Sequence, residues 1–339
     1  MRALKIIFYF SAIIVAILFI MFVLELIKSD WSFKKFGKGD YETRGLAINQ
    51  SFHTLEIETG AADVDILPSG DRECQVMLYE KNSMKSEVKV EDGVLKIKKT
   101  DTRKWYDYIG FDLGQAKITV FLPDASFEAI KVEASTGNVE IKEISVDGVT
   151  VKLSTGNISL FEIASNTIDL TASTGDVKIS DSDVRDTVKA TVSTGDISLS
   201  GVTGTPNIKL TATTGDATFK NVSAASLSAT ASTGDAKFTS VNVTGELYSK
   251  RSTGKTLLTD TTAGKFDLKA STGDVSFRGS DAEEIFVEVT TGDVEGTLLS
   301  DKVYITKTNT GKIDVPKTIT GGRCEITTTT GDIKISVIK

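Results

Sequence analysis

The sequence has few residues of the kinds that perform catalysis or cross-link small domains. It contains one histidine, His53, and two cysteines, Cys74 and Cys324, in 339 residues. Two cysteines cannot make a disulfide framework, and no C-x-x-C pair indicates a metal site. One histidine without a Ser or Cys in a nucleophile setting disfavours acid–base or nucleophilic catalysis. We therefore expect a protein that is not an enzyme and needs no cofactor.

Proline is also scarce, and the chain carries no excess of positive charge. Only four prolines occur, and no helical periodicity is visible after residue 40, which fits continuous β structure. The net charge is −7, which argues against a nucleic-acid partner. The sequence thus predicts a folded β protein whose partner is not a nucleic acid.

What the chain does contain is a repeat centred on the motif S-T-G-D or S-T-G-N. Successive repeat glycines are 19 or 20 residues apart every time. Eleven copies at one period indicate a stacked repeat architecture. The repeat glycines are Gly137, Gly156, Gly175, Gly195, Gly215, Gly234, Gly254, Gly273, Gly292, Gly311 and Gly331.

Apolar and polar residues alternate within each copy. Counted from the repeat glycine, positions −7, −5, −3, +2 and +4 are mostly apolar, as at Ile208, Leu210 and Ala212. A period of two belongs to a strand with one buried face. The glycine permits a tight corner, and we expect the following Asp or Asn to close that corner on its own backbone. Residues 126–339 therefore predict an all-β, single-stranded parallel β-solenoid (β-helix) of 19–20-residue coils, right-handed by the crossover rule.

The two cysteines fall in distant parts of this stack. Cys324 lies in the inward −7 column, and Cys74 lies in the opening coils. At ~4.8 Å for each coil they are roughly 60 Å apart, whereas a disulfide needs Cα atoms within about 7 Å. We predict that both thiols are free.

The N-terminus predicts a membrane anchor. Residues 6–24 carry no charge and are long enough to cross a bilayer as a helix. We expect a short cytoplasmic head at 1–5, a single-pass anchor at 6–27 and a linker at 28–50, with the solenoid outside the cytoplasm. A cleaved signal peptide is the alternative.

Residues 51–125 predict divergent opening coils, in which Gly60 belongs to a first, atypical copy. Within them, residues 99–115 form an aromatic loop with Trp105, Tyr106, Tyr108 and Phe111. One interpretation is that these rings cover the solenoid. The other is that they project and bind a sugar or a protein partner near the membrane.

Two regular polar columns accompany the repeat. The column after each glycine is mostly Asp or Asn, which indicates either turn chemistry or, as the alternative, a calcium ladder. The second column is a Thr/Ser face, which points outward and suits either strand-surface packing or contact with glycans. The Thr/Ser face consists of Thr171, Ser173, Thr191, Ser193, Thr211, Thr213, Thr230 and Ser232.

The predicted anchor, the divergent opening and the S-T-G-D coils together resemble the bacterial putative-adhesin family, a LiaG-like group of cell-envelope proteins. The resemblance covers residues 55–339. It implies an extracytoplasmic β-solenoid associated with the envelope or with envelope stress, and it implies no catalytic residues. We expect adhesion or envelope interaction through the surface, with an envelope protein or a cell-wall glycan as partner. The alternatives are a self-assembling scaffold that polymerises through an exposed solenoid end, which we place at the last coil, Gly331–Lys339, and a polysaccharide-processing enzyme.

Overall fold

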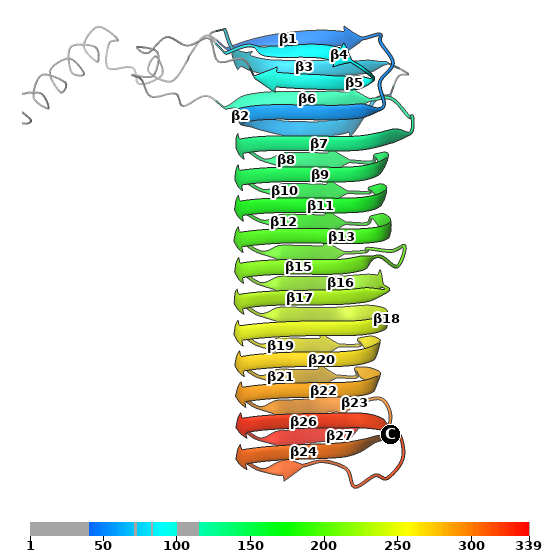
Figure 1. Cartoon of the computed structure of the whole chain (residues 1–339), viewed down its shortest axis with the longest axis vertical. Helices are drawn as coiled ribbons and strands as arrows, with labels where there is room; N and C mark the ends of the chain where they lie inside the picture. Colours follow the sequence, from blue (N-terminus) through cyan, green and yellow to red (C-terminus); the bar gives the residue numbers. More distant parts are fainter. Residues whose placement is uncertain (1–40, 71–72, 83, 100–114, 339) are drawn as a thin grey trace, which may run out of the picture.

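The computed structural model describes residues 41–70, 73–82, 84–99 and 115–338. Most of them form one parallel β-solenoid, drawn as a column of stacked strands in Figure 1, which confirms the predicted all-β solenoid. The predicted head, anchor and most of the linker lie outside the described residues. Within the described ranges, no helix has the length and apolar character needed to cross a membrane.

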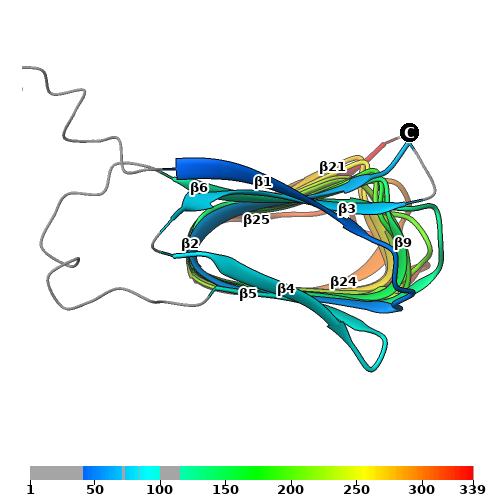
Figure 2. The ribbon, with the colours of Figure 1, turned by 90° about the horizontal axis from the view of Figure 1, so that it is seen from above.

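Each regular coil consists of a long strand, the glycine corner, a short strand and a second corner. Seen from above in Figure 2, the two kinds of strand form the two flat sides of an elongated ring. The long strands are β7 (Phe127–Thr136), β9 (Ser145–Thr155), β11 (Ala164–Thr174), β13 (Asp183–Thr194), β15 (Asn207–Thr214), β17 (Ser226–Thr233), β20 (Thr262–Thr272) and β22 (Asp281–Thr291). The short strands are β8 (Val139–Lys142), β10 (Ile158–Phe161), β12 (Val177–Ser180), β14 (Ile197–Ser200), β16 (Ala217–Ala224), β19 (Thr256–Thr259), β21 (Val275–Arg278) and β23 (Val294–Leu298). Strand β18 (Ala236–Thr253) supplies a short strand and the next long strand without a break.

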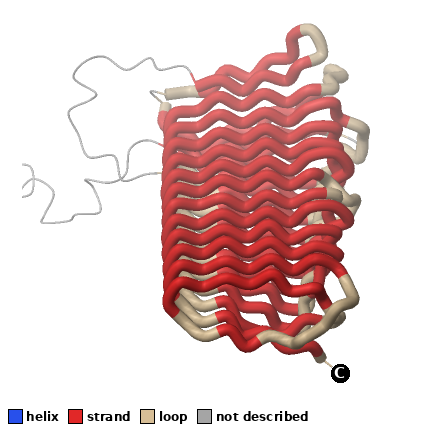
Figure 3. The backbone as a smooth tube through the Cα atoms, turned by 60° about the horizontal axis from the view of Figure 1, so that its bottom comes forward, coloured by secondary structure: helices blue, strands red, loops and turns tan. Residues whose placement is uncertain are grey.

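The coils stack in register, so equivalent positions of the repeat form straight columns (Figure 3). Ile208 pairs with Val188 on one side and with Leu227 on the other. The −7 column is buried as predicted: ten of its eleven residues belong to the core, and Tyr304 is the half-buried exception. Apolar side chains of both flat sides meet inside, as in the rings of Phe266 on β20 and Phe277 on β21, whose centroids are 6.1 Å apart.

The N-terminal end departs from the predicted series of parallel coils. Strand β2 (Thr54–Pro68) makes a whole coil that lies directly on β7 and β8. Strands β5 (Val94–Lys99) and β6 (Ala116–Leu122) come later in the chain but stack outside β2. Beyond them, β3 (Cys74–Lys81) and β4 (Ser86–Glu91) pair antiparallel with β6 and β5, and β1 (Tyr41–Ile48) pairs antiparallel with β3.

Two predictions about this opening were wrong. Residues 41–48 were assigned to the linker but form β1, whose alternating side chains lie against β3. Gly60 was taken as a corner glycine, but Ala62 stands in the corner column: Ala61 pairs with Thr136, and the Ala62 carbonyl faces Gly137. Gly60 lies two residues earlier, inside β2, where the backbone needs no special conformation.

The C-terminal end contains a second reversal of order. Strands β26 (Gly322–Thr330) and β27 (Ile333–Val337) insert between the β22–β23 coil and the coil of β24 (Lys302–Thr310) and β25 (Ile313–Asp314). Figure 1 shows β26 above β24. The prediction that Gly331–Lys339 forms the open end was therefore wrong, because β24 and β25 form the outermost coil.

Both cysteines are buried and free, which confirms the prediction. Cys74 begins β3 at the N-terminal end, whereas Cys324 lies in β26 near the other end. Burial raises the pKa of each thiol to about 12. At neutral pH both side chains therefore remain thiols and are poor nucleophiles.

Candidate binding surfaces

The glycine corner is the tightest point of every coil. Gly195 has φ 142°, and a Cβ placed there would lie 2.1 Å from the Gly175 carbonyl oxygen of the preceding coil. Gly215 meets Gly195 in the same way. Each corner therefore needs glycine for two reasons, a positive φ and direct contact between backbones. All eleven repeat glycines have positive φ.

The Asp and Asn residues after these glycines link successive coils. Asp196 N–H donates to Asp176 Oδ1, and Asp216 N–H donates to Asp196 Oδ1, both at 2.8 Å. The expectation that each side chain closes its own turn was therefore wrong, because the close stacking of the corners brings the next coil's N–H within its reach. The same bond joins Asp63 to Asn138, Asn138 to Asn157, Asn157 to Asp176, Asp216 to Asp235, Asp235 to Lys255, Asp274 to Asp293, Asp293 to Asp332 and Asp332 to Lys312, acceptor first.

The two lysines in this corner ladder have different settings. Lys312 belongs to the outermost coil, where no further N–H needs an acceptor. Lys255 offers no acceptor to the coil of Asp274, but its Nζ lies 3.0 Å from Asp274 Oδ2. The N–H of Asp293, together with Lys255, lowers the pKa of Asp274. Among the described residues, no three His, Cys, Asp or Glu side chains converge on a possible metal position.

The Thr/Ser face lies on the outer side of the long strands. Thr171, Thr191, Thr211 and Thr230 are neighbours in register on four successive strands and are half-buried. The Ser or Thr two residues after each of them is exposed. The result is a flat, uncharged surface of hydroxyl and methyl groups that repeats at the strand spacing of ~4.8 Å. Such a surface can contact several repeating units of a polymer at once.

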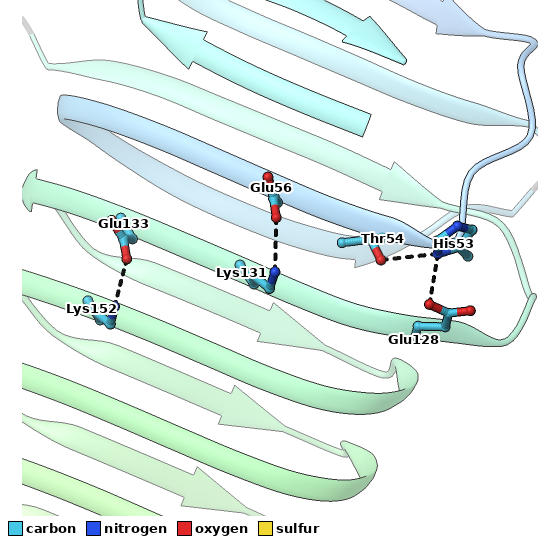
Figure 4. Close-up of polar contacts among 7 residues, drawn as sticks. All are labelled: His53, Thr54, Glu56, Glu128, Lys131, Glu133 and Lys152. Carbon is cyan, nitrogen blue, oxygen red and sulfur yellow. Dashed lines mark hydrogen bonds and ion pairs between the residues drawn. The ribbon is translucent and has the colours of Figure 1, made fainter. Parts of the chain in front are cut away.

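Charged residues border this face toward the N-terminal end. Lys131 Nζ lies 3.0 Å from Glu56 Oε1, and Lys152 Nζ lies 2.8 Å from Glu133 Oε1 (Figure 4). Each pair joins two neighbouring coils, and all four side chains are substantially exposed to water. Exposed pairs of this kind contribute little to stability, so their main effect is to set the polarity of the surface.

Aromatic rings border the same face toward the C-terminal end. Lys265 Nζ lies 5.1 Å from the centroid of the Phe286 ring, and the Arg323 guanidinium lies 5.3 Å from it. Both cations contact the ring, which is therefore already engaged within the protein. The Thr/Ser face is thus an uncharged band over four coils: in its inner column, Lys152 precedes Thr171 and Lys250 follows Thr230.

The lone histidine lies where β2 meets β7 and does not form a catalytic relay. His53 Nδ1 lies 3.0 Å from Glu128 Oε2 and 3.2 Å from Thr54 Oγ1, as Figure 4 shows. Both partners meet the same ring nitrogen, whereas Nε2 faces Gly93. A relay needs its nucleophile and its carboxylate on opposite nitrogens.

The structure leaves one predicted site untested and reveals a column that the sequence analysis missed. The aromatic loop residues Trp105, Tyr106, Tyr108 and Phe111 lie outside the described residues. At the second corner, eight successive coils place one residue in the left-handed region, at Glu143, Glu162, Asp181, Gly201, Asn221, Ser240, Asp260 and Gly279. The frequent Asp, Asn and Gly in this column were the available signal, because these residues tolerate that conformation best.

The fold and its surfaces define a class: a repeat protein that presents long, flat, regular faces. Within this class, the chain belongs to the Toastrack DUF4097 family, whose model matches residues 52–242 and 223–339. A comparison with curated proteins found no match.

Solved structures provide more distant likenesses. A putative lipid binding protein from Parabacteroides distasonis is 16% identical, with a TM-score of 0.44 over 77% of this chain and 95% of that one. A putative adhesin from the same species is 12% identical, with a TM-score of 0.37 over 88% and 98%. A putative adhesin from Bacteroides fragilis is 14% identical, with a TM-score of 0.33 over 87% and 97%. At these scores the likenesses carry no argument about function.

Proposed function

We propose that this protein is a membrane-anchored, extracytoplasmic solenoid that binds a component of the cell envelope through the Thr/Ser face. The observation that carries this proposal is the register of Thr171, Thr191, Thr211 and Thr230 over four coils. A repeating surface matches a repeating ligand, so the partner is a cell-wall glycan. The role is non-catalytic, since binding requires only the outer face.

Binding is tested by placing charge on the face without disturbing the core. Thr191→Lys with Thr211→Lys puts two cations on the long-strand side of two neighbouring coils. Ser198→Lys with Thr218→Lys puts two cations on the short-strand side of the same coils, where both residues are also half-buried. Co-sedimentation of the full-length protein with isolated cell walls should fall at least ~10-fold for the first pair only, because a desolvated charge costs more than ~1.4 kcal/mol.

An equal loss for both pairs would mean that general charge, and not the Thr/Ser face, controls binding. No binding by the wild type would overturn the glycan as partner. Crosslinking in cells would then show whether a neighbouring envelope protein takes its place.

The location is tested with a single exposed thiol. Ser193 is exposed on the Thr/Ser face, whereas Cys74 and Cys324 are buried. In intact cells, a membrane-impermeant maleimide should label Ser193→Cys and leave the wild type unlabelled. Labelling only after lysis would place the solenoid in the cytoplasm and overturn the proposal.

A second candidate function, self-association, is favoured by the C-terminal end. Among the described strands, β24 pairs only with β26, and β25 pairs only with β27. Six of the eight large exposed hydrophobic residues in the described chain lie at this end. They are Leu299, Val303, Ile305, Ile313, Ile319 and Ile338. An open strand edge beside apolar side chains is a template for another chain.

The occupant that fits this edge is a second copy of the same chain. If two β24 strands paired antiparallel about Thr306, Ile305 would face Lys307 and Lys302 would face Thr310, so no like charges would oppose. The outermost strands at the N-terminal end carry more charge, with Glu42 and Arg44 on β1 and with Glu87, Lys89 and Glu91 on β4, and charge on an edge strand opposes pairing with another chain. A closed end-to-end dimer is therefore better supported than an open polymer.

Light scattering of the full-length protein in mild detergent tests the dimer. Val303→Lys with Ile305→Lys should convert dimer to monomer. The matched control is Met77→Lys with Tyr79→Lys at the N-terminal end. Met77 and Tyr79 are 42% and 44% exposed, close to the 37% and 49% of Val303 and Ile305. A monomeric wild type, or a dimer that only the control pair breaks, would overturn this candidate.

A further inference from the structure

One coil of the core contains a buried cation. Arg251, at position −3 of strand β18, is 1% exposed and points into the solenoid, where the neighbouring coils carry Ala231 and Ala270 in register. Every other copy of the repeat carries Ala, Leu, Val or Thr at this position. A guanidinium in this place is therefore a feature of one coil and is not required by the repeat.

The buried cation has no partner within the described chain. Arg251 Nε, Nη1 and Nη2 make no hydrogen bond, and neither does Oγ of Ser249, which is fully buried two residues earlier on the same strand. Both side chains point to the same interior. Two groups with hydrogen-bonding capacity thus stand unsatisfied together, and each has lost the hydrogen bonds that water gives it in the unfolded chain.

The guanidinium keeps its charge. Burial lowers the pKa of Arg251 to about 10, opposed by the fields of Asp216 and Asp235, so the side chain is still protonated at neutral pH. These two carboxylates do not pair with it directly. Each already accepts a backbone N–H of the next coil, from Asp235 and Lys255 respectively.

The surrounding coils make room for a large polar group. Arg251 lies between Ala231 and Ala270 on the long-strand side, and on the short-strand side position +2 is Ala236 in the preceding coil and the buried Thr256 in its own coil. In the coil of Gly195 the equivalent positions are the larger Val192 and Ile197. The reduced side-chain volume around Arg251 extends over several coils and both flat sides.

We propose that Arg251 and Ser249 hold a small monovalent inorganic anion, of the size of chloride, inside the solenoid. The chemistry favours an anion over water. The guanidinium and the hydroxyl supply donors, and a halide needs only donors. A water molecule could accept from Arg251 and donate to the Ser249 hydroxyl, but it would leave the buried guanidinium without a counter-charge, which a halide supplies.

Thermal unfolding of the full-length protein in mild detergent tests the proposal, with chloride replacing gluconate at constant ionic strength. An anion bound only by the native state should raise the folding equilibrium constant about 10-fold when chloride is at ten times its Kd. Arg251→Met should remove this dependence. Lys250→Met changes the adjacent, outward-facing cation and should keep it.

A second measurement does not depend on whether Arg251→Met folds. Crystals of the wild type grown in bromide should give an anomalous peak within hydrogen-bond distance of the Arg251 guanidinium. If bromide gives no such peak, or if chloride stabilises the wild type no more than it stabilises Arg251→Met, the donors are hydrated and the anion site is ruled out.

Discussion

The two ends of the solenoid differ in how they stop the stacking of strands. At the N-terminal end, antiparallel pairings replace parallel ones, and Arg44 ties the layers together. Its guanidinium lies 3.0 Å from Glu80 Oε1 and also donates to the Ser86 carbonyl oxygen, while Ser86 N–H donates to Glu80 Oε2. This cluster joins β1, β3 and the start of β4.

At the C-terminal end the strands remain parallel, and only the residue types change. The outermost coil places Tyr304, Thr306 and Thr308 in columns where inner coils place apolar residues. One end therefore changes its pairing, and the other changes its composition. A parallel stack can thus end through a change of pairing or through a change of polarity, and both ends keep outermost strands with one unpaired edge, at β1 and β4 as at β24 and β25.

The largest expected effect separates the middle of the stack from its open end. Ile208 is 2% exposed, so Ile208→Asp buries an unpaired charge and should prevent folding, at a cost of several kcal/mol. Tyr304→Asp changes the same column in the outermost coil, where the residue is only half-buried. Circular dichroism should show a folded Tyr304 variant; equal unfolding of both would mean that the open end is as dry as the middle.

The second comparison concerns the corners. Gly195→Val forces a β-branched residue to positive φ and against the Gly175 carbonyl oxygen, and should cost at least ~3 kcal/mol. Lys178→Ala, an exposed change on a short strand, should cost less than ~0.5 kcal/mol. Chemical denaturation measures both. Similar midpoints for the two variants would contradict the corner model.

The third prediction concerns the Arg44–Glu80–Ser86 cluster at the N-terminal end. Glu80→Ala removes the carboxylate that accepts from Arg44 and from the Ser86 N–H, and should cost about 1–3 kcal/mol. Hydrogen exchange should rise in β1, β3 and β4 and remain unchanged in β15 and β17. Faster exchange along the whole column would show that the cluster stabilises every coil.

A smaller effect is expected in the corner ladder. Asp196→Ala removes the acceptor for Asp216 N–H and should cost about 1 kcal/mol, whereas Asp196→Asn keeps an acceptor oxygen and should cost less. Lys312→Ala serves as the control at the open end, since no further coil lies on Lys312. A larger cost for Lys312→Ala than for Asp196→Ala, measured by denaturation, would contradict the ladder.

Removal of calcium is expected to have no effect on stability. Each inner carboxylate of the ladder is occupied by an N–H of the next coil, so chelation of calcium should leave the melting temperature of the full-length protein unchanged. A drop that added calcium restores would show that the corner column binds metal after all.

The regular coils could be predicted from the sequence because each one repeats the same local rule. Alternation fixed the buried face, and the spacing of glycines fixed the length of the coil. The order of coils at the two ends could not be predicted, because parallel strands of the same repeat can pair with almost any other copy. The preference of β26 for the inner place is visible only when the two strands are compared: Ile326 gains more from burial than Thr306, which occupies the same column.

The binding surfaces were predicted only in part. The outward Thr/Ser column followed from the strand period, but the inter-coil role of Asp196 depends on how closely the corners approach, which no single copy reveals. Arg251 was hidden for a different reason. Its position in the repeat predicts burial, but only the arrangement of neighbouring side chains shows that it has no partner.

The inserted position of β26 and β27 has a consequence for biosynthesis. These strands leave the ribosome after β24 and β25, yet they occupy the gap between that coil and β22–β23. Coil-by-coil folding during translation can therefore proceed only as far as β23. The segment from 302 to 321 must wait, or detach again, until the strands that will lie beneath it have been made.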